Sequence, residues 1–181
     1  MNGARSLLVP GLPVAQPRRT SRGMRLKSGA VARVDFVPKS HPIHGWRALI
    51  TGLATAKWAG RPPLDGPVQL KVVFLFPRPG RLVWKRRPMP IEPHVAKPDA
   101  DNLVKAVKDA LKGIAWLDDC QVCLETVGKA YVRGGEGPRT LLQVLPAGEH
   151  LLRLAEELEG ETADVGVAAV VGARSGGREG P

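Results

Sequence analysis

The stretch from Asn102 to Lys112 constrains the fold of this chain more than any other. Four apolar residues recur there at helical spacing and form one face: Leu103, Val107, Ala110 and Leu111. Gly113 follows, a residue type that commonly ends helices. The pattern predicts an amphipathic helix, and its apolar face has to pack against other elements of a core.

The other predicted elements alternate with this helix. Residues 41–60 carry apolar side chains at helical spacing, with Pro42 near the start and Gly60 beyond the end. Four segments have the composition or alternation of strands, namely 30–38, 68–77, 121–132 and 139–146, and the last two are expected to form a hairpin. The order predicts an α+β fold, a small two-layer domain with a mixed β-sheet packed against helices.

Composition divides the chain into three parts. Residues 1–26 mix Pro, Gly and Arg without a helical or strand period, which predicts a flexible basic arm. Residues 27–146 hold the predicted elements and form the domain. Residues 147–181 are expected to form a short acidic helix and then a disordered tail. No apolar run approaches the roughly 18 residues that cross a bilayer, and no signal pattern opens the chain, so we expect a cytoplasmic protein without a membrane partner.

The formal net charge is +10, with 27 Lys and Arg against 17 Asp and Glu. Basic side chains also outnumber acidic ones within residues 27–146. Such a surplus favours polyanions, because a protein that neutralises phosphates releases their counterions. Charge alone is also typical of ordinary soluble proteins, so it does not decide between nucleic-acid binding and simple solvation.

Aspartates cluster around the predicted helix. Asp99 and Asp101 precede it, and Asp118 and Asp119 follow its end. Helix capping accounts for one aspartate at the start, but two at i and i+2 exceed what a cap needs. The alternative is a divalent metal site, since Mg²⁺ is usually held by a few carboxylates together with water and substrate phosphate oxygens.

Two further side chains belong to the predicted helix. Lys105 lies one turn after Asp101, where it could contact a phosphate or form an i, i+4 ion pair. Asp109 shares a face with Asp101 through i+8 spacing. From the pattern alone, metal-assisted phosphodiester chemistry and ordinary capping with surface pairing remain open.

Cys120 and Cys123 are too few for a disulfide framework. Their spacing, with His41 and His44 as further ligands, could supply a zinc site. In a strand, however, positions i and i+3 point to opposite faces, so we favour buried small thiols instead.

The segments KPDADNLVKAVKDAL and WLDDCQV resemble the signature of the RusA Holliday junction resolvases, small endodeoxyribonucleases often carried by phages and prophages. The shared features are Asp-x-Asp-Asn, a lysine four residues after the second aspartate, Asp-Ala-Leu at the helix end, and the Asp-Asp-x-Gln-Val turn. The match is densest over residues 97–122 and looser over 27–146. This chain lacks the Pro-Pro-Ser-Asn-rich segment that typical members carry near the start.

The resemblance implies a Mg²⁺-dependent nuclease, with Mn²⁺ as a substitute ion, that acts in DNA recombination and repair. Catalytic roles would fall on Asp99, Asp101, Asp119 and Lys105. The metal ligands would be Asp99, Asp101 and Asp119 with Asp118, while Asp109 would be a supporting residue and Asn102 would orient the turn. A symmetric homodimer with two sites would nick opposed strands of a four-way or other branched DNA.

Basic residues between the second strand and the predicted helix are our candidates for DNA contact: Arg78, Arg81, Lys85, Arg86, Arg87 and Lys97. Two rival readings stay open. A restriction-like nuclease could use Pro98-Asp99, but Glu125 and Lys129 have the wrong spacing for the acid-x-Lys that such sites need. A DNA-binding module without catalysis would use the aspartates only for caps and ion pairs.

Overall fold

The computed structural model of the chain describes residues 3–17, 20–25, 27–29 and 31–164. The chain divides into two compact units, Met1–Pro146 and Ala147–Pro181. The elements in chain order are β1 (Arg5–Pro10), β2 (Thr20–Arg25), β3 (Val31–Phe36), α1 (Ile43–Lys57), β4 (Val68–Phe76), the 3-10 turn η1 (Gly80–Leu82), β5 (Glu92–Pro93), α2 (Ala100–Leu111), the 3-10 turn η2 (Asp119–Gln121), β6 (Val122–Tyr131), β7 (Arg139–Pro146) and α3 (Gly148–Asp164).

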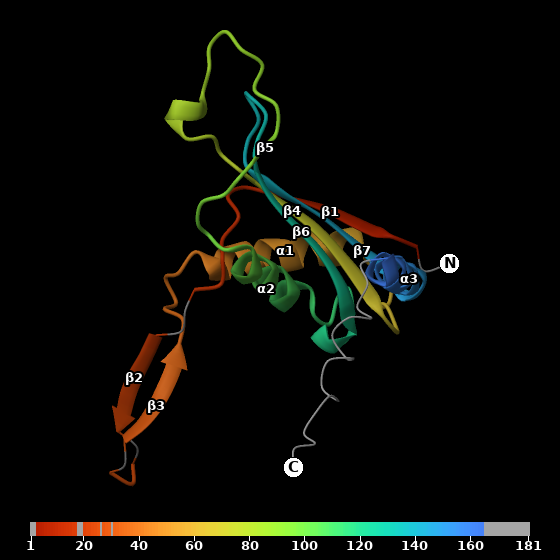
Figure 1. Cartoon of the computed structure of the whole chain (residues 1–181). Coiled ribbons are helices and arrows are strands. Elements are labelled where there is room, and N and C mark those ends of the chain that lie inside the picture. Colours follow the sequence, from red (N-terminus) through yellow and green to blue (C-terminus); the bar gives the residue numbers. More distant parts are fainter. Residues whose placement is uncertain (1–2, 18–19, 26, 30, 165–181) are drawn as a thin grey trace, which may run out of the picture. The chain divides into compact units, whose positions relative to one another are not determined.

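A five-stranded mixed sheet forms the centre of the first unit, with the strand order β1-β7-β4-β6-β5 (Figure 1). β4 and β6 are parallel, because α2 carries the chain back between them, and the other neighbours are antiparallel. The expected hairpin of residues 121–132 and 139–146 is wrong. Both segments are strands, but β7 pairs with the opposite edge of β4, so β4 lies between them.

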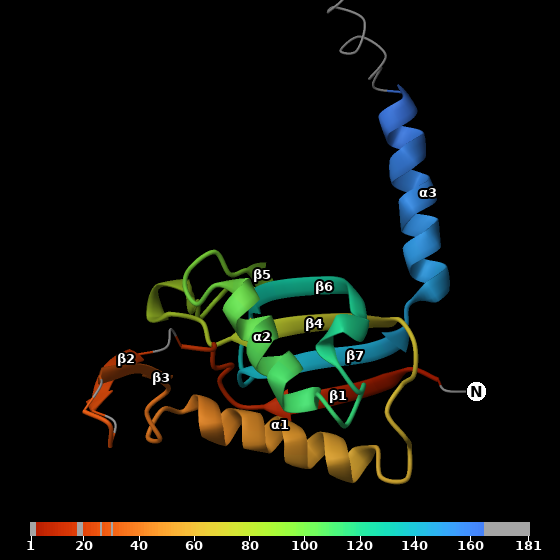
Figure 2. The same cartoon turned by 90° about the horizontal axis from the view of Figure 1, so that it is seen from below.

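Helices α1 and α2 cover one face of this sheet (Figure 2). The amphipathic patterns that predicted both helices are confirmed, because their apolar faces are the buried ones. Trp46 and Ile50 of α1 and Leu103 and Val107 of α2 join a single core cluster with alternate residues of β4. The α+β, two-layer expectation for the first unit is therefore confirmed.

The expectation of a flexible arm over residues 1–26 is wrong for residues 5–10. They form the edge strand β1, which pairs with β7 along its whole length. Leu7 and Val9 point into the core, where their exposed fractions are 5% and 0%. Arg5 is also buried: its guanidinium donates hydrogen bonds to the carbonyl oxygens of Ile114, at 3.2 Å, and Pro62. β2 and β3 form a separate antiparallel pair, so residues 20–25 are a strand as well.

The second unit contains α3, a longer helix than the short one expected from the sequence. Its acidic side chains include Glu149, Glu156 and Glu157, which are exposed. The predicted disorder of residues 165–181 lies outside the described residues. Among the residues that the structure describes, no helix is both long enough and apolar enough to span a membrane.

Candidate active site

Asp99 and Asp101 lie at the amino-terminal end of α2, beside the carboxyl ends of the parallel strands β4 and β6. The short strand β5 fixes this location, because it pairs with Ala130 and Tyr131 at the end of β6. The ring of His94, which follows β5, stacks on Phe76 at 4.4 Å between ring centroids. In sheets with parallel strands, ligand and catalytic sites usually form at the carboxyl ends of the strands.

Lys129 of β6 holds the backbone that leads into Asp99. Its ammonium donates hydrogen bonds to the carbonyl oxygens of Ala96, at 2.8 Å, and Pro98, at 2.7 Å. His94 adds a second anchor, since its backbone N–H donates to the carbonyl of Lys129 at 3.0 Å. Burial lowers the pKa of His94, and the positive charge of Lys129 acts in the same direction. The loop between β5 and α2 is thus tied to the sheet immediately before the aspartates.

Asp99 and Asp101 keep their carboxylates free. Asp99 is the N-cap residue of α2, yet its side chain makes no capping hydrogen bond. Asp101 lies in the first turn, and both residues are exposed. Neither side chain has a hydrogen-bond or ion-pair partner among the described residues. Simple capping therefore does not account for Asp99, and both carboxylates remain available as ligands.

Most other carboxylates of the first unit are already committed, as six pairs show: Arg47 with Asp109 at 3.4 Å, Arg78 with Glu92 at 3.3 Å, Lys108 with Glu125 at 2.6 Å, Lys112 with Asp118 at 2.6 Å, Arg139 with Glu136 at 2.7 Å, and the indole of Trp116 with Asp119 at 2.9 Å. Asp109 forms an ion pair to α1, and a supporting role for it at the site stays a prediction. Within residues 37–146, only Asp65 resembles Asp99 and Asp101 in being exposed and unpartnered.

Lys105 follows Asp101 by one helical turn, is exposed, and has no partner in the part of the chain that the structure describes. The i, i+4 ion pair considered from the sequence is not formed. Asn102 is partly buried, and its backbone carbonyl accepts a hydrogen bond from the backbone N–H of Gln16 at 2.8 Å. The segment after β1 is therefore attached to the start of α2.

Asp118 and Asp119 lie at the other end of α2 and have structural partners. Asp118 forms a capping box with Gln121, whose amide also donates to the carbonyls of Leu64 and Gly66. The hydrogen bond from Lys112, assisted by the backbone N–H of Cys120, lowers the pKa of Asp118 to about 2. Asp119 accepts a hydrogen bond from the indole of the fully buried Trp116, which fixes one of its two oxygens.

Within one chain, the structure does not bring the four predicted metal ligands together. α2 has 12 residues and is therefore about 18 Å long. Asp99 and Asp101 are at the start of this helix. Asp118 and Asp119 follow the helix and directly precede β6, at the opposite end of the strands. Among the described residues, no group of three or more His, Cys, Asp or Glu side chains is placed to hold a metal ion.

The loop between β4 and β5 carries most of the predicted DNA contacts. Arg81, Lys85, Arg86 and Arg87 are exposed there, as is Lys97 in the next loop. Arg78 is different, because its side chain is only 3% exposed and pairs with Glu92. Its guanidinium also donates to the carbonyls of Val132, at 2.8 Å, Leu82 and Pro90. The prediction that Arg78 contacts DNA is therefore corrected: it is a structural residue of the loop.

The zinc alternative finds no support. Cys120 and Cys123 are free and exposed, so the expectation of buried thiols is also wrong. Cys120 lies in η2 rather than in a strand. His41 accepts a hydrogen bond from the N–H of Ile43, and His44 contacts the carbonyl of Pro38. None of these four residues belongs to a possible metal-binding group among the described residues.

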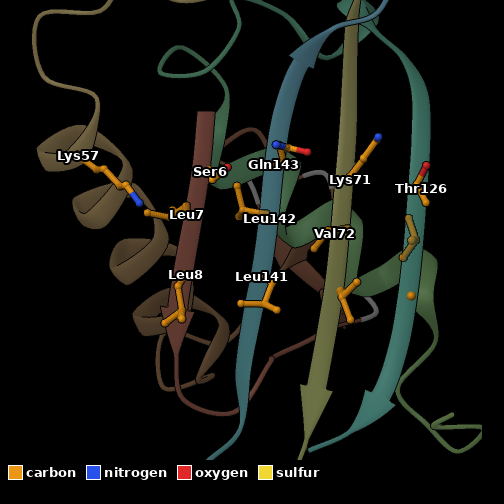
Figure 3. A pocket seen from close by; sticks show the side chains of 13 residues that line it. Ser6, Leu7, Leu8, Lys57, Lys71, Val72, Thr126, Leu141, Leu142 and Gln143 are labelled. Carbon is orange, nitrogen blue, oxygen red and sulfur yellow. The ribbon is translucent and has the colours of Figure 1, made fainter. Parts of the chain in front are cut away.

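A hollow of about 590 Å³ lies on the sheet face opposite α1 and α2 (Figure 3). Its lining is mostly apolar, with Leu8, Val73 and Leu141 exposed, and Lys57 and Lys71 are the charged residues among the described ones that line it. Among the described residues, no carboxylate and no histidine lines it. The hollow therefore lacks groups for phosphodiester hydrolysis, and the unpaired aspartates mark the better candidate.

A comparison with known protein families identifies the family of this chain. Residues 10–144 match the model of a family described as Endodeoxyribonuclease RusA. The matched range spans most of the chain, so this protein belongs to that family and is a nuclease of the endodeoxyribonuclease class. The match begins at residue 10, which adds the segment after β1 to the family domain expected from residue 27. A comparison with curated proteins gives no match.

Proposed function

We propose that this chain is a Mg²⁺-dependent endodeoxyribonuclease that resolves four-way DNA junctions by paired symmetric nicks, in recombination and repair. Family membership supports the nuclease class and a branched DNA substrate. The observation that carries the proposal is the pair of exposed, unpartnered carboxylates of Asp99 and Asp101, within a domain where most of the other described acids are paired. We expect it to act in the cytoplasm, where its DNA substrate is accessible.

The residues at the start of α2 fit a hard divalent cation. Mg²⁺ prefers oxygen ligands, keeps several waters, and commonly takes only one or two carboxylates together with substrate phosphate oxygens. Asp99 and Asp101 offer such carboxylates at a location that DNA can reach. A bound ion of this kind activates water and stabilises the leaving oxygen of a phosphodiester.

The chain's own side chains would do the remaining work. Asp99 and Asp101 would bind the ion, and Lys105, one turn further along α2, would contact the scissile phosphate and stabilise its developing negative charge. Lys129 would keep the loop before Asp99 in place through Ala96 and Pro98. The exposed cations of the loop between β4 and β5 would bind the DNA backbone.

Asp119 requires a second chain if it is to join this site. About 18 Å of helix separates the two groups of aspartates in one chain. In the proposed homodimer, the start of α2 in one copy can lie next to the end of α2 in the other. The oxygen of Asp119 that Trp116 does not engage would then face Asp99 and Asp101 of the partner. Two such sites related by twofold symmetry suit a four-way junction, which has two strands to cut.

The test is cleavage of a synthetic four-way junction and of a linear duplex with the same sequence, in Mg²⁺ and in EDTA. We expect paired nicks in the junction, none in the duplex, and no cleavage in EDTA while the junction remains bound. A protein that binds the junction equally well in both buffers, and does not cut it with any divalent metal, would be a DNA-binding module, and the proposal would fail.

A further inference from the structure

The loop between β4 and β5 presents an aromatic residue, Trp84, among its cations. Figure 1 shows this loop extending beyond the ends of β4 and β6. Arg81, Lys85, Arg86 and Arg87 are exposed on it, and Trp84 is partly exposed. The other tryptophans of the chain, Trp46, Trp58 and Trp116, are at most 5% exposed. Trp84 is therefore the one tryptophan that a ligand can reach without unfolding the core.

Three anchors hold this loop in a defined form. Arg78 donates to the carbonyls of Val132, Leu82 and Pro90, and these bonds join the start and end of the loop to the residue that follows β6. Met89 packs so closely on Gly134 that a Cβ atom added to that glycine would lie 2.3 Å from the methyl carbon of Met89. The backbone N–H of Trp84 contacts the sulfur of Met89 at 3.3 Å. A loop fixed in this way can present a rigid surface.

A cation lies over one face of the Trp84 ring. The guanidinium carbon of Arg78 lies over the ring, 5.9 Å from its centroid. Because Arg78 is nearly buried and bonded to three carbonyls, it is a fixed cation over one face of the indole. The face that Arg78 does not cover is the one on which a flat ligand can stack.

An aromatic side chain flanked by cations is the arrangement with which proteins hold unpaired nucleotides. The bases stack on the ring and the phosphates pair with the cations. A continuous duplex offers few exposed base faces, whereas a branch point contains bases that have lost a stacking neighbour. Arg86 and Arg87 are two and three residues from Trp84, so backbone contacts and a stacking contact can form together.

We infer that Trp84 is a stacking platform for an unstacked base at the branch point, and that it contributes to the preference for branched over linear DNA. This inference rests on the proposed function, because it assumes a branched substrate. It adds a chemical basis for the preference that neither the carboxylates nor the surface charge supplies, since both would act equally on a linear duplex.

The test uses the intrinsic tryptophan fluorescence of the wild-type protein, titrated in EDTA with a four-way junction, a linear duplex and a single strand of the same sequence. Stacking of a base on the accessible indole should quench part of the emission with the junction and the single strand, and less with the duplex. Emission that does not change on saturation with the junction would overturn the inference, and this measurement involves no substitution.

A matched pair of variants completes the test. Trp84→Leu keeps an apolar side chain but cannot stack, so its junction affinity should fall by about 5- to 150-fold, the range for loss of one base–aromatic contact. Trp84→Phe keeps a ring and should stay within about threefold of wild type. Duplex affinity should change little in either variant. A junction affinity of Trp84→Leu within twofold of wild type, in a variant that melts like wild type, would overturn the inference.

Failure of this inference can be separated from failure of the proposed function. Cleavage of the junction by the same wild-type preparation in Mg²⁺ tests the function alone. Junction cleavage without any tryptophan quenching would remove the role of Trp84 and leave the nuclease intact. Quenching that disappears in Trp84→Leu, in a protein that cuts no branched DNA, would support the stacking surface while rejecting the function.

Discussion

The ammonium of Lys129 lies 2.7 Å from the carbonyl oxygen of Pro98, the residue immediately before Asp99. Through this contact, and the one to Ala96, strand β6 fixes the backbone from which the carboxylate of Asp99 projects. Lys129 touches neither aspartate by any hydrogen bond or ion pair in the described residues. We therefore regard it as a positioning residue for the candidate metal site.

Lys129→Met should weaken metal binding more than DNA binding. The substitution keeps the length of the side chain but removes both hydrogen bonds, so the loop before Asp99 loses its attachment to the sheet. Loss of a residue that orients metal ligands typically costs 10- to 100-fold in metal affinity. The Mg²⁺ concentration for half-maximal junction cleavage should rise by about that factor, while the junction affinity in EDTA stays unchanged.

Lys71→Met is the matched control for this experiment. Lys71 is also a strand lysine, but it lies on β4 in the open hollow and has no partner among the described residues. Its substitution should leave the Mg²⁺ requirement unchanged. An equal shift in both variants would mean that loss of positive charge, and not loss of positioning, changes the metal requirement.

Removal of the charge should lower the thermal stability at Arg78 and weaken DNA binding at Arg86. Arg78→Met leaves the carbonyls of Val132 and Leu82, whose hydrogen bonds are partly buried, and Glu92 without their partner, at a cost of about 1.5–3 kcal/mol, and should lower Tm by several degrees. Arg86→Met should not change Tm, but should reduce the slope of log K against log salt for DNA binding by about 0.9. Thermal melts and salt titrations of both variants check this. A stable Arg78→Met protein with a reduced salt slope would restore Arg78 as a DNA contact.

Two inactive variants should complement each other if the site spans the dimer. Asp101→Asn and Asp119→Asn homodimers should each be inactive. In a mixed dimer, one of the two sites would combine the intact Asp101 of one chain with the intact Asp119 of the other. Mixing should therefore restore nicking of a single junction strand. Mixed dimers that form but remain inactive would show that Asp101 and Asp119 do not act in one site across the interface.

The hydrogen bond from Lys112 should control the titration of Asp118. Its pKa of about 2 lies below the ordinary value of 3.8, so this pair stabilises the fold above about pH 4 and loses its contribution as the pH falls toward 2. Lys112→Met should raise the pKa of Asp118 toward the ordinary value, as followed by the NMR shift of its carboxyl carbon. Lys57→Met, which removes a distant lysine, should leave the titration of Asp118 unchanged.

Local sequence patterns predict those elements whose signal lies in contiguous residues. The apolar stripes of α1 and α2 and the apolar run of β4 are properties of contiguous residues, and all three were found. β1 was missed because six residues near Pro and Arg carry little signal, and its partner, β7, is more than 100 residues away in sequence. The pairing of β6 and β7 was mistaken for the same reason: sequence proximity favours a hairpin, whereas the parallel β4–α2–β6 unit separates the two strands.

Within the site, residue type indicated Asp99, Asp101 and Lys105, but it could not show which other acids have partners. The roles of Asp118 and Asp119 depend on Gln121, Lys112 and Trp116, which only the fold brings into place. The sequence does carry a signal for the special position of Lys129. It alternates with Val127 and Tyr131, which pack on the core, so a lysine stands on the side of β6 where an apolar residue is expected.

The most direct test of the central claim compares Asp101→Asn with Asp65→Asn in cleavage of a four-way junction in Mg²⁺. Both substitutions remove an exposed carboxylate that has no partner in the described residues, but only Asp101 lies at the start of α2. We predict that Asp101→Asn binds the junction and cuts none of its strands, whereas Asp65→Asn cuts like wild type. Junction cleavage by Asp101→Asn at the wild-type rate would contradict the assignment of hydrolysis to this end of the helix.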